Sequence, residues 1–169
     1  TAVHVTPHIA LLPDLRAEGY DIHYIVAYEG MEKNWITAQG SQYEGVATGR
    51  VSRDLSAKNL TGPFRVIKGF QQAKKLIRDY KPDVVFSKGG FVAVPVVLAA
   101  GHYHIPVIIH DSDMTPGLAN KLCMRTAKKI WCTFPETVKL LPADKSVLTG
   151  NPIHRALLTG SRAAGFAFS

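Results

Sequence analysis

Short apolar runs and longer amphipathic segments alternate along most of the chain. The apolar runs are rich in β-branched residues, which favour strands, and lie at residues 20–26, 42–46, 83–87, 106–110 and 129–132. The segments between them space their apolar residues along one helical face, at residues 6–18, 31–38, 63–80, 92–103 and 116–124. The pattern therefore predicts helices and strands in regular alternation.

This alternation indicates an α/β fold class. Strands that are nearly all apolar, joined by connections of a few residues, are typical of a parallel sheet that is covered on both faces. We therefore predict a doubly wound, mostly parallel sheet. Ligands of such sheets bind beyond the carboxyl ends of the strands, so binding residues are expected where strands lead into helices.

Length and charge narrow the class of protein. The chain has 169 residues, 46% of them hydrophobic, which suffices for one ordinary core. Its longest apolar run, residues 92–100, is far shorter than the roughly 18 to 20 residues of a membrane-spanning helix. The formal net charge of +7 favours contact with phosphates, nucleic acid or an anionic membrane. Aromatic and basic residues are not interleaved as in nucleic-acid-binding proteins, so no nucleic-acid partner is expected.

The chain has two cysteines, Cys123 and Cys132. Their spacing does not suggest a zinc site, and no secretory signal precedes them. We expect both to be reduced, partly buried thiols, and a disulfide is the weaker alternative.

The first strand-to-helix junction, residues 1–7, contains His4. Thr6 is predicted to cap the helix and Pro7 to lie in its first turn. An imidazole with an ordinary pKa of about 6.5 can accept a proton near neutral pH, so His4 is a candidate general base. The alternative is a surface or capping histidine.

The second junction has the sequence Ser87-Lys88-Gly89-Gly90-Phe91 and follows a buried strand. Two glycines allow the backbone to approach a ligand closely, and the helix N-terminus behind them attracts anions. A phosphate or pyrophosphate site is therefore one interpretation. The other is a tight turn that requires positive φ angles.

The third junction, residues 110–121, is rich in polar side chains. Asp113 or Thr115 is predicted to cap the helix that Pro116 opens. The His110, Asp111 and Asp113 cluster could also suggest a metal, but it lacks the spacing of a dedicated site, so none is expected.

The long helix at residues 63–80 has two apolar faces. Its predicted core face carries Val66, Phe70, Ala73, Ile77 and Tyr80. The opposite face carries Phe64 and Ile67 among basic residues that include Lys68, Lys74 and Lys75. Apolar side chains ringed by basic ones can bind an anionic membrane surface, although the lysines could equally form a solvated face.

Four segments together resemble the N-terminal domain of MurG-type glycosyltransferases. They are residues 1–7, residues 87–95, residues 110–120 and the sequence Thr149-Gly150-Asn151-Pro152. The resemblance implies a GT-B architecture, in which residues 1–155 form a Rossmann-like acceptor domain and 156–169 a linker or trailing end. It further implies that a first strand upstream and a C-terminal donor domain are missing from this chain.

The resemblance also implies an activity. Such enzymes transfer N-acetylglucosamine, with inversion, from UDP-N-acetylglucosamine to the C4 hydroxyl of a lipid-linked muramyl-pentapeptide acceptor during peptidoglycan synthesis. They act peripherally at the cytoplasmic face of the anionic bacterial inner membrane, and no cofactor is expected. The alternative is a non-catalytic, membrane-anchoring or acceptor-binding subunit of a split GT-B transferase.

Site residues follow from the matched motifs. His4 and Asp113 are the implied catalytic residues, and Asp113, His154 and Arg155 are implied donor contacts. The acceptor pyrophosphate is expected to contact Thr1, Ala2, Ser87, Lys88, Gly89, Gly90 and Phe91. The chain departs from the family pattern at Val3, where glycine is usual, at Asp113, where asparagine is common, and at His154, which aligns with an arginine.

Overall fold

The computed structural model describes residues 2–27, 36–38, 40–47 and 62–159, with the side chains of 2–4, 62–65, 156 and 159 outside the description. Its helices are α1 (Ala2–Ala17), α3 (Gly62–Tyr80), α4 (Ala93–His102), α5 (Leu118–Cys123), α6 (Pro135–Val138) and the 3-10 helix η2 (Arg155–Thr159). Its strands are β1 (His23–Ala27), β2 (Gln42–Val46), β3 (Val85–Ser87), β4 (Val107–Asp111), β5 (Lys129–Cys132) and β6 (Ser146–Leu148).

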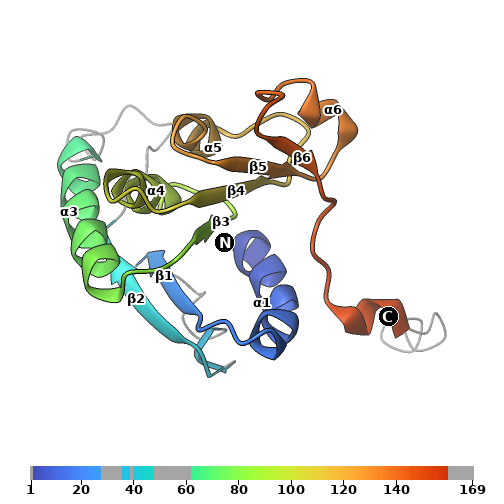
Figure 1. Cartoon of the computed structure of the whole chain (residues 1–169), viewed down its shortest axis with the longest axis horizontal. Coiled ribbons are helices and arrows are strands. Elements are labelled where there is room, and N and C mark those ends of the chain that lie inside the picture. Colours follow the sequence, from blue (N-terminus) through green and yellow to red (C-terminus); the bar gives the residue numbers. More distant parts are fainter. Residues whose placement is uncertain (1, 28–35, 39, 48–61, 160–169) are drawn as a thin grey trace.

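The strands form two parallel sheets (Figure 1). β1 pairs with β2, while β3, β4, β5 and β6 are adjacent in that order. Every strand pair among the described residues is parallel, which confirms the predicted class. Because all four strands of the larger sheet run the same way, their carboxyl ends share one edge.

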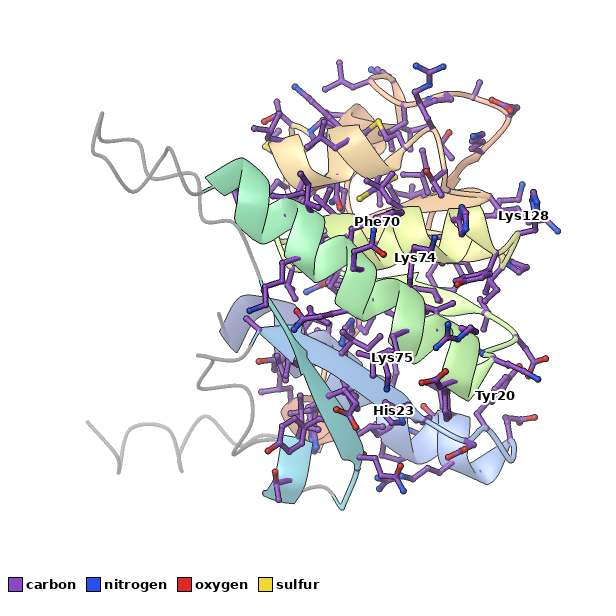
Figure 2. The ribbon with its side chains drawn as sticks, turned by 90° about the vertical axis from the view of Figure 1, so that its left-hand side faces the viewer. Tyr20, His23, Phe70, Lys74, Lys75 and Lys128 are labelled. Atoms are coloured by element: carbon purple, nitrogen blue, oxygen red, sulfur yellow. The ribbon has the colours of Figure 1, made fainter. Side chains whose placement is uncertain are left out.

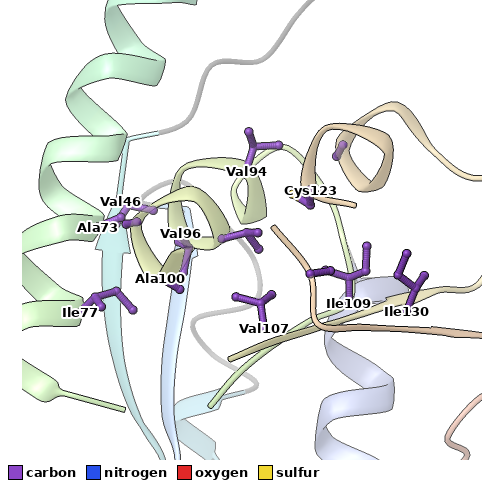
Figure 3. Close-up of a cluster of buried hydrophobic side chains, with 14 of the residues drawn as sticks. Val46, Ala73, Ile77, Val94, Val96, Ala100, Val107, Ile109, Cys123 and Ile130 are labelled. Carbon is purple, nitrogen blue, oxygen red and sulfur yellow. The ribbon is translucent and has the colours of Figure 1, made fainter. Parts of the chain in front are cut away.

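A helical layer covers one face of the larger sheet. α4 packs between α3 and α5, and all three contribute to the main core (Figure 3). Val107, Ile109 and Ile130 project from β4 and β5 toward Val97 and Cys123 in this core, and all are fully buried. Full burial of such a side chain stabilises the fold by about 1.5–3 kcal/mol.

α1 lies on the opposite face. The His8 ring lies 5.3 Å from the Phe86 ring of β3, which in turn lies 5.5 Å from Trp131 of β5. On either side of His8 in α1, Val5 and Leu12 join a second core cluster with Tyr24, Val26 and Ile36. Helices therefore cover both faces, as the doubly wound arrangement requires.

Most predicted elements are confirmed to within two residues. The prediction for 42–46 and 129–132 is correct at both ends, and the helix predicted at 63–80 ends at Tyr80. Lys81 follows with a positive φ of 52° and Pro82 comes next, so the helix cannot continue. The prediction for 31–38 lies outside the described residues except for 36–38, which are helical.

One helix start and the caps of two helices were predicted wrongly. α1 begins at Ala2, so Thr6 is not its cap and Pro7 lies inside the helix. Packing of Val5 in the second core cluster favours this longer helix, although Pro7 removes one hydrogen bond. α5 begins at Leu118 after Gly117, and neither Asp113 nor Thr115 caps it. The short elements α6, β6 and η2 were not predicted.

Candidate functional site

A small pocket lies at the carboxyl ends of β3 and β4. The loop after β3 contributes Lys88, Gly89 and Gly90, and the remaining lining residues are Asp111, Ser112, Asp113, Gly117, Ala119 and Asn120. The pocket thus joins the second and third junctions of the sequence. This is the edge at which parallel sheets bind ligands.

The loop of residues 88–90 that follows β3, the glycine loop, has a backbone conformation that requires glycine at positions 89 and 90. Gly89 and Gly90 have φ angles of 89° and 80°, which side-chain-bearing residues rarely adopt. A Cβ on Gly89 would also lie 2.9 Å from Asn120 Oδ1. The Gly89 N–H donates to Ser87 Oγ at 3.1 Å, so this amide already has a partner within the loop.

Lys88 reaches from this loop into a polar network. Its side chain is only 4% exposed. Nζ donates to His110 Nδ1 at 2.7 Å, to Ser112 Oγ and to Asn151 Oδ1 at 3.0 Å. Burial lowers the pKa of Lys88 to about 8, although the nearby carboxylates of Asp111 and Asp113 oppose the shift.

His110, at the end of β4, is fixed in one tautomer. Its Nε2 lies 2.8 Å from the Gly150 carbonyl oxygen, which only accepts, so Nε2 carries the proton and Nδ1 accepts from Lys88. Burial lowers the pKa of His110, against the Gly150 hydrogen bond, which raises it. His110 is therefore a neutral connector between Lys88 and the segment that contains Gly150.

Asp111 organises the loop that follows β4. One carboxylate oxygen accepts from the Asp113 N–H at 3.0 Å, and the other accepts from Asn120 Nδ2 at 2.9 Å and the Gly117 N–H at 3.3 Å. Asn120 Oδ1 is buried with no partner among the described residues. It is thus an unsatisfied acceptor in the pocket wall, beside Gly89.

Comparison with known proteins places this geometry in a family. A family model described as the Glycosyltransferase family 28 N-terminal domain matches residues 1–132. The chain belongs to this family.

Individual relatives agree with this assignment. The chain is 61% identical over 98% of its length to the UDP-N-acetylglucosamine-N-acetylmuramyl-(pentapeptide) pyrophosphoryl-undecaprenol N-acetylglucosamine transferase of Lachnospira eligens. It is 54% identical over 99% of its length to the transferase of the same name from Lachnoclostridium phytofermentans. Each alignment covers 47% of the relative, so the chain spans about half the length of the curated relatives it matches.

Solved structures give the same result for the fold. Acinetobacter baumannii MurG superposes with a TM-score of 0.75 at 30% identity, over 89% of this chain and 42% of that chain. A UDP-GlcNAc 2-epimerase from Neisseria meningitidis has a TM-score of 0.66 at 15% identity, over 94% of this chain and 47% of that chain, and shares the fold alone. The resemblance to MurG-type transferases drawn from the sequence is confirmed.

The family's first motif is not a loop in this chain. Ala2 and His4 belong to α1, so residues 2–7 are helical where a strand-to-helix loop was predicted. Thr1 and the side chains of Ala2 and His4 lie outside the description. Residue 4 precedes His8 by about one turn on the same helical face, and His8 packs against Phe86 of β3.

The other predicted site residues fall in different surroundings. Ser87, Lys88 and Gly89 are buried and Phe91 is half-buried, whereas Asp113 is exposed at the pocket. Arg155 forms an exposed ion pair with Asp14 of α1, at 2.6 Å. His154 and Arg155 do not line the pocket, and their role as donor contacts stays a prediction.

The structure also identifies residues that were not singled out as site residues. Asp111, Ser112 and Asn120 line the pocket, while His110 and Asn151 bind Lys88. All of them lie in motifs that carry the family resemblance. Their pairing depends on contacts between distant segments, which a local sequence pattern does not specify.

The predicted membrane face of α3 is confirmed as exposed only in part. Ile67 is 59% exposed, and Lys68 and Lys75 are exposed as well. Lys74 is instead half-buried, with Nζ over the Phe70 and Tyr103 rings, because it lies on the edge of α3 next to α4 (Figure 2). The Phe64 side chain lies outside the description.

The prediction of the core face of α3 is correct for the middle of the helix and not for its two ends. Ala73 and Ile77 are buried, but Val66 and Tyr80 at the two ends are each 38% exposed. Among the described residues, no helix is long and apolar enough to cross a membrane.

Other groups in the described part of the chain give no second site. No three histidine, cysteine or acidic side chains there are close enough together to hold a metal ion. Cys123 and Cys132 are unpaired, and both are fully buried where partial burial was expected. Burial raises the pKa of Cys123 to about 11.

Proposed function

We propose that this chain is the acceptor-binding half of an N-acetylglucosaminyltransferase of the MurG type. The observation that carries the proposal is the 61% identity, over nearly the whole chain, to the Lachnospira eligens enzyme of that name. The donor is UDP-N-acetylglucosamine, and the acceptor is the muramyl sugar of a lipid-linked pentapeptide precursor.

The reaction is a direct displacement with inversion. The C4 hydroxyl oxygen of the muramyl sugar attacks the anomeric carbon of N-acetylglucosamine, the bond from that carbon to the diphosphate oxygen breaks, and UDP leaves. A general base takes the hydroxyl proton. We assign this role to His4, because an imidazole accepts a proton near neutral pH without a large pKa shift.

The pocket beside the glycine loop supports the acceptor assignment. Gly89 and Gly90 keep the loop free of side chains, so the pyrophosphate of the acceptor can approach the backbone closely. The N-terminal end of α4 and the charge of Lys88 make the surroundings favourable for an anion. Asp113, at the rim, is the second candidate base.

We place the protein peripherally on the cytoplasmic face of the inner membrane. The exposed Ile67, Lys68 and Lys75 on α3 support this proposal, since apolar insertion and basic charge together bind anionic lipid. A lipid-linked acceptor would then be reached from the membrane surface.

The test compares the chain alone with a completed enzyme. Fusing the chain to the half of the Lachnospira eligens relative that it does not match should give transfer of labelled N-acetylglucosamine to a soluble lipid-linked muramyl acceptor. The chain alone should be inactive, because most donor contacts belong to the other domain. A folded fusion that binds the acceptor without transferring sugar would favour the non-catalytic subunit instead.

A further inference from the structure

The hydrogen bonds that Lys88 makes within the protein leave it no N–H donor for a bound phosphate. A lysine ammonium has three N–H donors and no acceptor. In this structure they point to His110 Nδ1, Ser112 Oγ and Asn151 Oδ1. All three donors are therefore used within the protein.

The direct hydrogen-bond partners of Lys88 are all neutral groups. Within the part of the chain that the structure describes, the ion pairs join Lys75 and Arg78 to Asp79 and Arg155 to Asp14, and none involves Lys88. Burial costs this cation its solvation, and the nearby carboxylates of Asp111 and Asp113 offset only part of that cost, so good hydrogen bonds are needed to retain it. A buried lysine of this kind holds the groups that accept its hydrogen bonds in one arrangement.

Lys88 and its partners come from three separate segments. Lys88 itself follows β3, His110 and Ser112 belong to the end of β4 and its loop, and Asn151 lies beyond β6. The His110 ring adds a second tie to the last segment, because Nε2 donates to the Gly150 carbonyl. The network thus fastens residues 150 and 151 to the glycine loop.

We propose that Lys88 is a positioning residue for the transfer reaction, fastening the segment that contains Gly150 and Asn151 to the glycine loop rather than binding the acceptor phosphates itself. The inference rests on the proposed function for its effect on catalysis. It assigns the fastening to hydrogen bonds within the chain, from Lys88 to His110, Ser112 and Asn151.

The proposal requires the protonated form of Lys88. A neutral amine has two N–H donors, so loss of the proton releases one of the three acceptors. The ionisable groups around Lys88 are His110 and Asp111 at the end of β4 and Asp113 in the loop that follows. Because the pKa of Lys88 is about 8, the fastening weakens in the mildly alkaline range.

The kinetic test uses the fusion of this chain with the unmatched half of the Lachnospira eligens relative, and the variants Lys88→Met and Asn151→Ala. Loss of hydrogen bonds to a charged group should lower kcat by about 10- to 100-fold for Lys88→Met and less for Asn151→Ala. The acceptor KM should change less than about threefold in both. If Lys88→Met instead raises the acceptor KM more than about tenfold while Asn151→Ala has no effect, Lys88 binds phosphate directly and the proposal is wrong.

The pH profile separates positioning from a merely structural role. The wild-type kcat should fall above pH 8, whereas Lys88→Met should show a low kcat without this alkaline fall. A fall that persists unchanged in Lys88→Met belongs to another group and overturns the proposal. Lys128→Met, which removes an exposed lysine between α5 and β5, is the matched control and should behave as the wild type.

Hydrogen exchange tests the fastening without reference to activity. The Thr149 N–H donates to the Cys132 carbonyl at 3.0 Å, so peptides that span residues 149–153 report on the segment. Exchange there should be faster in folded Lys88→Met than in the wild type or Lys128→Met. Unchanged exchange refutes the fastening even if the enzyme is active, whereas a wild type that transfers no sugar refutes only the proposed function.

Discussion

The polar network around Lys88 and the outer face of α3 both carry positive charge, yet they hold it in opposite ways. Lys88 is 4% exposed and has a fixed acceptor for each of its donors. Lys75 is exposed, and its partner is Asp79 one turn along the same helix, in a pair with both side chains largely in water. The hydrogen bonds hold Lys88 and its partners in place, whereas the exposed side chains of α3 can adapt to a surface.

This difference separates the two functions that we propose. A catalytic site needs groups that are held in place before the ligand arrives, because the cost of ordering them would otherwise raise the barrier. A membrane contact needs accessible charge and apolar side chains whose exact orientation matters little. Substitutions in the two regions should therefore affect different measurements.

The largest difference between an effect on kcat and an effect on binding is expected from the substitution of His4. In the fusion enzyme, His4→Ala should lower kcat by about 10²- to 10⁴-fold with little change in acceptor affinity, as expected for loss of a general base. Steady-state kinetics with a soluble acceptor measures both quantities. His102→Ala removes an exposed histidine from the last turn of α4 and should leave kcat unchanged. A raised acceptor KM with an intact kcat would make His4 a binding residue, and Asp113 the next candidate base.

Rigidity of the site is tested by Gly89→Ala. The added Cβ would meet Asn120 Oδ1 at 2.9 Å and would force a side-chain-bearing residue to a φ of 89°. Because Asp111 holds Asn120, we expect the free energy of unfolding to fall by about 1–3 kcal/mol. Gly117→Ala is the matched control, since its Cβ would meet nothing within 4 Å at an ordinary φ of −65°. Equal denaturation midpoints for both variants would show that the glycine loop is not constrained.

The same contrast explains how far the sequence could predict this protein. Helical spacing placed Ala73 and Ile77 in the core and Ile67 on the surface, because burial in a helix follows a local period. Apolar runs located the strands for a similar reason. The carboxyl-end rule for parallel sheets then identified the correct loops.

What the sequence could not predict depends on long-range contacts. Lys88 and Asn151 are far apart in the chain, and only the order of the strands brings them together. Lys74 lies at a position that the helical pattern assigns to the outer face, but the neighbouring Tyr103 ring from the end of α4 draws it inward. Thr6 fits a capping pattern, yet packing of Val5 extends the helix past it.

The outer face of α3 is tested by the double substitution Phe64→Ser and Ile67→Ser in the fusion enzyme. Removing two apolar groups should weaken binding to anionic vesicles by roughly tenfold or more, without a change in denaturation midpoint. Vesicle sedimentation at low and high salt measures the loss. Leu140→Ser is the control, because Leu140 is 58% exposed but lies beyond α6, away from α3. Unchanged sedimentation of the double variant would remove α3 from the membrane contact.

The last prediction concerns how the buried charge of Lys88 makes the free energy of unfolding depend on pH. Because the pKa of Lys88 falls from 10.5 to about 8 on folding, the unfolded chain binds more protons than the folded one between these values. Stability should therefore rise with pH through this window, by at most about 1.4 kcal/mol per pH unit. Buried Cys123 and Tyr24, with pKa values raised to about 11 and 12, act in the opposite sense at higher pH.

The measurement is therefore confined to pH 7–9 and taken as a difference between variants. Chemical denaturation of Lys88→Met should lack the rise that the wild type and Lys128→Met show, since methionine fills a similar volume without a proton to lose. Parallel curves for all three proteins would mean that Lys88 keeps an ordinary pKa and is solvated in the folded state. In that case the contrast with the exposed lysines of α3, from which the positioning role was inferred, would not hold.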